Sequence, residues 1–146
     1  MTVRQIIQAP DDRLLRRCAK IISIDDRVRL LAEDLVETRR HHDGLGLAAP
    51  QVGESVRLVA FNPGRVCGYP IVVNPEIIAR GNNQSWGDEG CLSIDGGKRF
   101  VRVRRWDTVT MRFQTLRGAT AQTTIRGLAA RIAQHEIDHL DGKLIA

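Results

Sequence analysis

The chain has 146 residues, a length that fits one domain with its own hydrophobic core. Hydrophobic residues make up 42% and charged residues 27% of it, which is typical of globular proteins and excludes a disordered or coiled-coil chain. No apolar run approaches the length of a membrane span, and the N-terminus lacks the apolar segment of a secretory signal. We therefore expect a single domain over residues 1–146 and no membrane segment.

Lysine and arginine exceed the acidic residues by 22 to 17, which gives a formal net charge of +5. The surplus is concentrated in Lys98, Arg99, Arg102, Arg104 and Arg105. This cluster could contact phosphate groups, but its alternation with Val101 and Val103 is also typical of a solvated strand face. No aromatic-interleaved nucleic-acid motif accompanies it, so we expect the solvated face and no specific nucleic-acid partner.

The first half of the chain predicts two helical stretches. A short one opens at Pro10 and runs to about Cys18. A stronger helix runs from about Asp26 to His42, with Asp25 as its N-cap. Its apolar residues recur at the spacing of one helix face, namely Val28, Leu31, Ala32 and Leu35.

The second half predicts several strands followed by a helix. Residues 57–62 and 71–74 form short apolar runs, and Pro75 is expected to stop the second one. Residues 107–114 alternate clearly, and Gly118 marks a turn before a strand at about 121–125. A helix is predicted from about Gly127 to Leu140, with Leu128, Ile132, His135 and His139 on one face. Strands between an early and a late helix favour an α+β fold over a doubly wound parallel sheet.

The late helix contains the pattern H-E-x-x-H at residues 135–139. Residues four apart lie on the same helix face, so His135 and His139 can bind one metal ion, and Glu136 can exchange protons with a bound water. The alternative is an amphipathic helix whose histidines only flank the core. Asp138 either orients one histidine or is exposed to solvent.

A catalytic site of this kind needs a third protein ligand. Only seven residues follow His139, so we expect this ligand upstream. Cys18 has an apolar setting typical of a small buried residue, and nothing in the spacing gives Cys67 a partner. Cys91 lies in the turn-rich segment Asp-Glu-Gly-Cys-Leu-Ser, where it is either a ligand or an inert loop cysteine.

A glycine-rich segment, GLGLAAPQVG, covers residues 44–53. It lacks the spacing of a phosphate loop or a dinucleotide fingerprint. Its small residues allow a close approach of the backbone to a ligand or to another strand. Gln51 is its one polar side chain, and a buried amide needs a partner, for which a developing oxyanion is one candidate.

Together, GLGLAAPQVG, EGCLS and QHEIDHLDG closely resemble the three ordered motifs of the peptide deformylases. The resemblance extends over essentially the whole chain. It implies antiparallel β-sheets packed around a C-terminal metal-binding helix, with an N-terminal helix on the outside. It also implies removal of the formyl group from the formyl-methionine end of newly made polypeptides, with release of formate.

The resemblance further implies roles for individual residues. The metal ligands would be Cys91, His135 and His139, around Fe²⁺ in the physiological state, with Zn²⁺, Ni²⁺ or Co²⁺ as substitutes. Glu136 would be the general base and then the acid. The oxyanion would be stabilised by Gln51 and by the backbone N–H of Leu92, and Gly46 would shape the substrate cleft. From their positions beside the motifs, we expect Leu45, Leu92, Leu128 and Ile132 to line the methionine pocket.

The chain departs from the family pattern in two places. Asp95 stands where many relatives have proline, and either Lys98 or Arg99 corresponds to a basic residue that contacts substrate backbone. Many bacterial relatives continue into a C-terminal helix associated with ribosome docking, whereas this chain ends at Ala146. The resemblance therefore implies a short form near the ribosome without that helix, in a bacterial or phage-infected cytoplasm or in an organelle.

Two other functions are weighed against deformylation. A metallopeptidase with the same helix would cleave internal peptide bonds and would not need Cys91. A nonenzymatic RNA-binding module would use the basic cluster of residues 98–105 and would tolerate the loss of Glu136.

Overall fold

The computed structural model describes residues 2–145. Its helical elements are the 3₁₀ turns η1 (Asp12–Leu15), η2 (Ala49–Val52) and η3 (Asp95–Gly97) and the helices α1 (Asp26–His41) and α2 (Leu128–Leu140). Its strands are β1 (Gly46–Ala48), β2 (Leu58–Phe61), β3 (Ile71–Arg80), β4 (Gln84–Gly90), β5 (Phe100–Trp106), β6 (Thr108–Gln114) and β7 (Thr120–Arg126). The predicted α+β class is confirmed.

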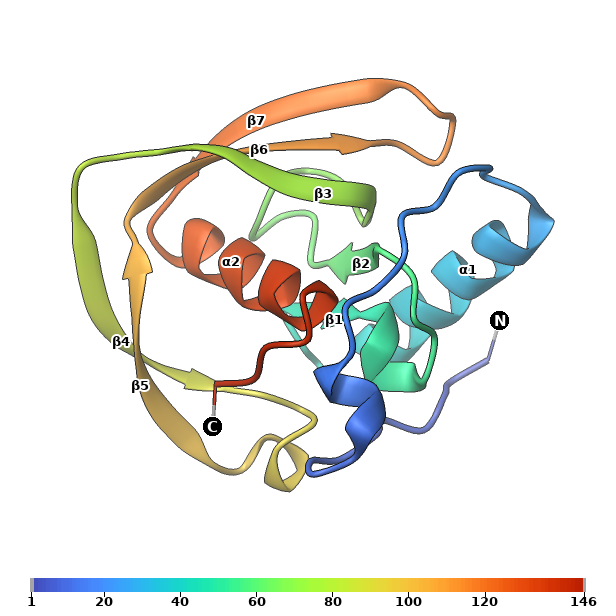
Figure 1. Cartoon of the computed structure of the whole chain (residues 1–146), viewed down its shortest axis with the longest axis horizontal. Helices are drawn as coiled ribbons and strands as arrows, with labels where there is room; N and C mark the ends of the chain where they lie inside the picture. Colours follow the sequence, from blue (N-terminus) through green and yellow to red (C-terminus); the bar gives the residue numbers. More distant parts are fainter. Residues whose placement is uncertain (1, 146) are drawn as a thin grey trace.

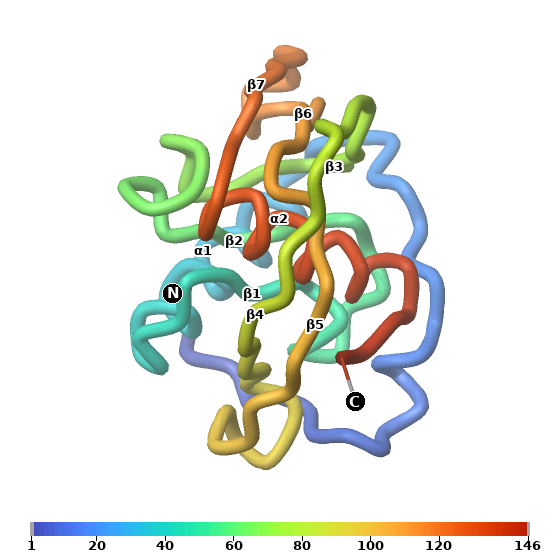
Figure 2. The backbone as a smooth tube through the Cα atoms, turned by 90° about the vertical axis from the view of Figure 1, so that its left-hand side faces the viewer, coloured from blue at the N-terminus to red at the C-terminus, as the bar shows by residue number. Residues whose placement is uncertain are grey.

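The strands form two antiparallel sheets that partly enclose α2. One has the order β1-β2-β3-β6-β7, and the other is the ribbon β4-β5. Figure 1 shows α2 in the middle of the molecule, with β3, β6 and β7 above it and the ribbon beside it. Figure 2 shows β3 running on into β4, and β5 into β6. The ribbon is therefore carried by the large sheet and reaches around the helix.

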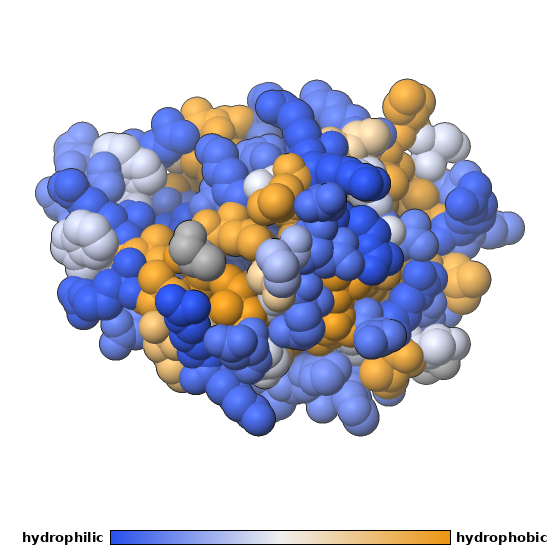
Figure 3. Space-filling view, turned by 60° about the horizontal axis from the view of Figure 1, so that its bottom comes forward, coloured by the Kyte–Doolittle hydropathy of each residue, from blue (hydrophilic) through white to orange (hydrophobic). Residues whose placement is uncertain are grey.

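The five-stranded sheet separates two apolar cores. Along β2, alternate side chains point to opposite faces: Phe61 packs in the core that α2 completes with Leu140, while Leu58 packs in the core that α1 completes with Leu35. All four side chains are fully buried. The N-terminal helix thus lies outside the sheet, as expected. On the face shown in Figure 3, apolar side chains gather in the middle and hydrophilic ones surround them.

Several features predicted from local sequence patterns are present in the structure. The carboxylate of Asp25 accepts a hydrogen bond from the backbone N–H of Val28 at 3.0 Å, as the predicted N-cap of α1. In β6 the alternating residues Val109, Met111 and Phe113 are buried. The predicted turn at Gly118 is present, and this glycine has a positive φ of 86°.

Three predictions about local structure were wrong. The first helical stretch is only the 3₁₀ turn η1 and ends before Cys18. Pro75 does not stop β3, because an irregularity in the pairing with β6 between Val73 and Glu76 accommodates it. The segment before Cys91 is not a turn but the strand β4, whose partner is β5. Within residues 2–145, no helix has the length and apolar character to cross a membrane.

Candidate active site

Three buried side chains converge between α2 and the end of β4. The ligand atoms of Cys91, His135 and His139 all lie within 4.8 Å of one another. The Cys91 Sγ lies 3.3 Å from Nε2 of His139. The two histidines are four positions apart on α2, which places them one above the other, while Cys91 follows β4 directly. The structure therefore brings together the three predicted ligands.

The donor set fits a divalent transition metal. A thiolate and two imidazoles are ligands of iron, zinc, nickel and cobalt, and three protein donors leave a position for water. Burial lowers the pKa of His139 to about 3, so its imidazole is neutral at neutral pH, the form that binds metals. Its Nδ1 is buried without a hydrogen-bond partner among the described residues.

Glu89, at the end of β4, holds the first histidine. Its Oε1 lies 2.9 Å from Nδ1 of His135, which leaves the other ring nitrogen for a metal. Arg105 donates two hydrogen bonds of 2.9 Å to the same carboxylate, and Arg131 donates one of 2.7 Å. The interpretation that Asp138 orients a histidine is not supported, because this residue accepts from Arg105 instead.

Glu136 follows His135 on α2 and lines the same cavity as Cys91 and His135. Its carboxylate is buried, and Oε1 has no hydrogen-bond partner among residues 2–145. Burial raises the pKa of this carboxyl to about 7. A group with that pKa can both take and return a proton at neutral pH. The backbone of Gly46 packs closely on it, since a Cβ at this position would lie 2.8 Å from Oε2 of Glu136.

Gln51 lies in η2 and is 2% exposed. Its Oε1 accepts from the backbone N–H of Ala48 at 3.0 Å, and its Nε2 donates to Oγ of Ser93 at 3.1 Å. These two bonds fix the amide with Nε2 at 3.8 Å from Sγ of Cys91. The side chain is thus oriented toward the metal ligands, as a donor to an oxyanion must be.

A cavity of about 410 Å³ is lined by Gln51, Cys91, His135 and Glu136. Its lining includes the four residues expected for the methionine pocket, which are Leu45, Leu92, Leu128 and Ile132. Ile132 is buried, whereas Leu128 is 48% exposed at the mouth. Neither Lys98 nor Arg99 is among the lining residues, while Phe100 is.

Sequence reasoning missed three side chains at this site: Glu89, Phe100 and Arg131. Glu89 stands inside the EGCLS motif, but nothing in that motif indicates its contact with His135. Cys18 and Cys67 are outside this cavity lining. Cys18 is buried, as expected for a small apolar residue.

A glutamate next to three metal-binding side chains at a cavity is the arrangement of mononuclear metal-dependent hydrolases. Comparison with known proteins identifies one family within this class. The family model described as polypeptide deformylase matches residues 3–146. A peptide deformylase of Dictyoglomus thermophilum is 42% identical over 144 residues, which cover 98% of this chain and 90% of that protein.

Solved structures agree with this match. A crystal structure of peptide deformylase from Thermotoga maritima superposes with a TM-score of 0.92 at 36% identity, over 99% of this chain and 96% of that one. An actinonin-bound class I type b peptide deformylase from Acinetobacter baumannii gives 0.90 at 32% identity, over 99% and 97%. The chain belongs to the polypeptide deformylase family.

Proposed function

We propose that Cys91, His135 and His139 hold one divalent cation at which the chain carries out the reaction of its family. That reaction is hydrolysis of the N-formyl group from the N-terminal formyl-methionine of newly made polypeptides, with release of formate. The observation that carries this assignment is the buried Cys-His-His cluster with the unpartnered carboxylate oxygen of Glu136 beside it. When bound, the cation supplies a Lewis acid and acidifies a water molecule.

The chain's own residues transfer the protons and stabilise the negative charge that develops in the reaction. Glu136 accepts a proton from the attacking water and returns it to the leaving amine, for which a pKa of about 7 is suitable. The Nε2 of Gln51 and the backbone N–H of Leu92 donate to the oxygen that gains charge as the formyl carbon becomes tetrahedral. The hydrogen bonds to Ala48 and Ser93 keep the Gln51 amide oriented beforehand.

We propose Fe²⁺ as the physiological ion, with Zn²⁺, Ni²⁺ and Co²⁺ as functional substitutes. The support is the thiolate of Cys91, a soft ligand that suits these late transition metals and not Mg²⁺ or Ca²⁺. A thiolate ligand is also sensitive to oxidation. Purification under anaerobic conditions is therefore part of the test.

The substrate enters as an extended N-terminal segment of a nascent peptide. We propose that its methionine side chain packs against Leu45, Leu92 and Ile132, with Leu128 at the mouth, because this wall is apolar. Gly46 keeps the wall open beside Glu136. Such substrates arise where translation starts with formyl-methionine, so we propose that the enzyme works near ribosomes in a bacterial or phage-infected cytoplasm or in an organelle.

The test is formate release from formyl-Met-Ala-Ser by protein loaded anaerobically with Fe²⁺. We expect formate from the native chain and a large loss in Glu136→Gln, with unchanged metal content. Cleavage of internal peptide bonds without formate would establish the metallopeptidase alternative instead. Folded, metal-loaded protein that releases no formate would refute the proposal.

The ligand assignment has a separate test in the three thiols. Cys91→Ala is expected to lose stable metal binding. Cys18→Ala and Cys67→Ala are matched controls that lie outside the cavity and should keep the metal. Equal metal content in all three variants would show that Cys91 is not a ligand.

A further inference from the structure

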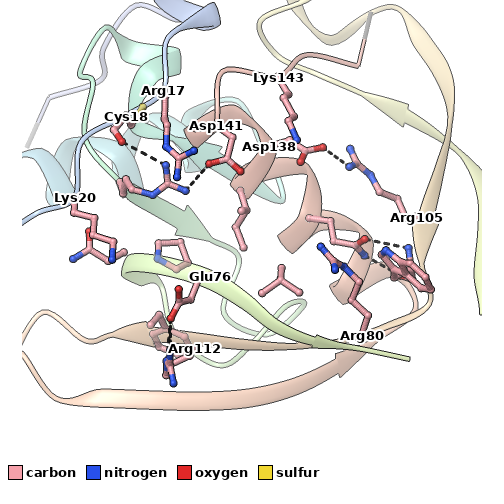
Figure 4. Close-up of a pocket in the computed structure, with 18 of the residues that line it drawn as sticks. Arg17, Cys18, Lys20, Glu76, Arg80, Arg105, Arg112, Asp138, Asp141 and Lys143 are labelled. Atoms are coloured by element: carbon pink, nitrogen blue, oxygen red, sulfur yellow. Dashed lines mark hydrogen bonds and ion pairs between the residues drawn. The ribbon is translucent and has the colours of Figure 1, made fainter. Parts of the chain in front are cut away.

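A second, larger groove lies away from the metal cavity. Its volume is about 870 Å³, and it shares no lining residue with that cavity. The last turns of α2 contribute Gln134, Ile137 and Asp138 to it, and Asp141 follows the helix, whereas the proposed metal ligands of α2 are not in its lining. Figure 4 shows this groove with basic side chains from Arg17 and Lys20 at one end to Arg80 at the other. The two sites are thus separate.

Basic side chains dominate the groove. Its three acidic residues each pair with an arginine, as Arg57–Asp141 at 2.8 Å, Arg112–Glu76 at 2.6 Å and Arg105–Asp138. Five further cations remain, which are Arg17, Lys20, Arg80, Arg104 and Lys143. All five are exposed, and none has a side-chain carboxylate of residues 2–145 within 4.0 Å. The groove therefore offers unneutralised positive charge to an anion.

The fold also supplies aromatic rings beside these cations, which the linear sequence did not reveal. In the β4–β5 ribbon, Trp86 stands directly opposite Arg104, and Gln84 opposite Trp106. These four residues share one face of the ribbon, because opposed pairs two residues apart point the same way. Trp86 is 60% exposed and is not itself in the groove lining, but it shares its ribbon face with residues that are. Arg80 lies 5.9 Å from the ring centroid of Trp106.

Exposed cations beside an exposed aromatic ring, here Trp86, are the elements that bind single strands of nucleic acid, in which phosphates meet basic side chains and bases stack on rings. We propose that this groove and the adjoining ribbon face, carrying Trp86, form a binding surface for single-stranded polynucleotides. Binding is independent of base sequence, since every base has a stacking face. Phosphate alone would not use Trp86, and a duplex would hide its bases from the ring. The surface serves the enzyme in addition to its deformylase activity.

Fluorescence anisotropy of labelled oligouridylate and oligodeoxythymidylate, each about 12 nucleotides long, tests this proposal. We expect dissociation constants of about 10⁻⁶ to 10⁻⁴ M near physiological salt. A plot of log affinity against log salt should have a slope of up to about −3.5 if all five cations meet phosphates. Tighter binding of oligouridylate than of oligodeoxythymidylate would identify RNA as the ligand. Equal binding of the two probes would show that the surface recognises the phosphates and bases that RNA and DNA share.

Two sets of variants make the test specific. Arg80→Ser with Arg104→Ser should make the slope shallower by about 1.4. The matched control, Arg27→Ser with Arg40→Ser, removes the same charge from exposed positions of α1 and should change the slope little. Both double variants should keep formate release from formyl-Met-Ala-Ser, which also shows that they are folded.

Trp86 distinguishes a polynucleotide surface from a simple anion surface. Trp86→Ala should weaken oligouridylate binding about 5- to 150-fold, and Trp86→Phe should restore most of it. Inorganic polyphosphate of similar charge should bind the native and Trp86→Ala proteins equally. The proposal is overturned if Trp86→Ala binds oligouridylate as the native chain does, or if both double variants change the slope equally.

Discussion

Replacement of Glu89 by glutamine tests the carboxylate that holds His135, one of the proposed metal ligands. In the native chain, Oε1 contacts His135 and accepts from Arg105, while Oε2 accepts from Arg105 and Arg131. Glutamine has the same shape but only one acceptor oxygen. In either orientation, its NH₂ group faces donors that the carboxylate satisfied. The substitution thus leaves buried positive charge without its counterion.

Two independent estimates give the same loss of stability for Glu89→Gln. Removing one partner of a buried ion pair costs about 3–5 kcal/mol, and Glu89 is only 6% exposed. Burial alone would raise the pKa of Glu89, but hydrogen bonds from His135 and Arg105 outweigh it and lower the pKa to about 2 from 4.5. By linkage, a shift of this size corresponds to about 3 kcal/mol of stability. This stability is present above pH 4.5 and is lost as the pH falls toward 2.

Chemical unfolding in urea measures the change at pH 7. We expect Glu89→Gln to lower the free energy of unfolding by about 3 kcal/mol and to weaken metal binding about 10- to 100-fold. The variant should also lack much of the loss of stability between pH 4.5 and 2. Glu76→Gln is the matched control, because its pair with Arg112 is about half exposed and is worth about 0–1 kcal/mol. Equal unfolding midpoints for the two variants would refute the reasoning.

Three further predictions concern the cavity and the remaining thiols. Gly46→Ala places a methyl group 2.8 Å from Oε2 of Glu136, so we expect a lower kcat for formate release, and an unchanged kcat would contradict it. Gln51→Leu should lower kcat about 10²- to 10³-fold while the metal content measured by elemental analysis stays the same. Burial raises the pKa of the Cys18 and Cys67 thiols, so iodoacetamide at pH 8 should label both slowly in the folded chain and rapidly after unfolding, as read by mass spectrometry.

The sequence predicted elements whose signals are local. The N-cap at Asp25 and the alternation from Val109 to Phe113 each depend on residues a few positions apart, and both are correct. The strand β4 was missed because its residues are mostly polar and exposed. Only its pairing with β5 defines it, and that pairing joins segments separated by the loop around η3.

The same distinction applies to the active site. The predicted ligands converge because two lie on one helix turn and the third stands in a short motif. The role of Glu89 could not be predicted, because its partners come from β5 and α2, distant in sequence. The basic cluster was interpreted as a solvated strand face, and this is wrong for Arg105, which is 8% exposed and paired with Glu89.

The ion pairs of Arg105 determine which substitutions can test the metal cavity and the large groove independently. It lines the large groove, yet its guanidinium is occupied by Glu89 and Asp138. An anion in the groove could bind the guanidinium of Arg105 only by separating it from Glu89, whose carboxylate holds His135. Weaker polynucleotide binding after substitution of Arg105 would therefore not identify a phosphate contact, because the same change disturbs a predicted metal ligand. Arg80 and Arg104 have no such partner among the described carboxylates, so their loss changes the charge of the groove without disturbing Glu89 or His135.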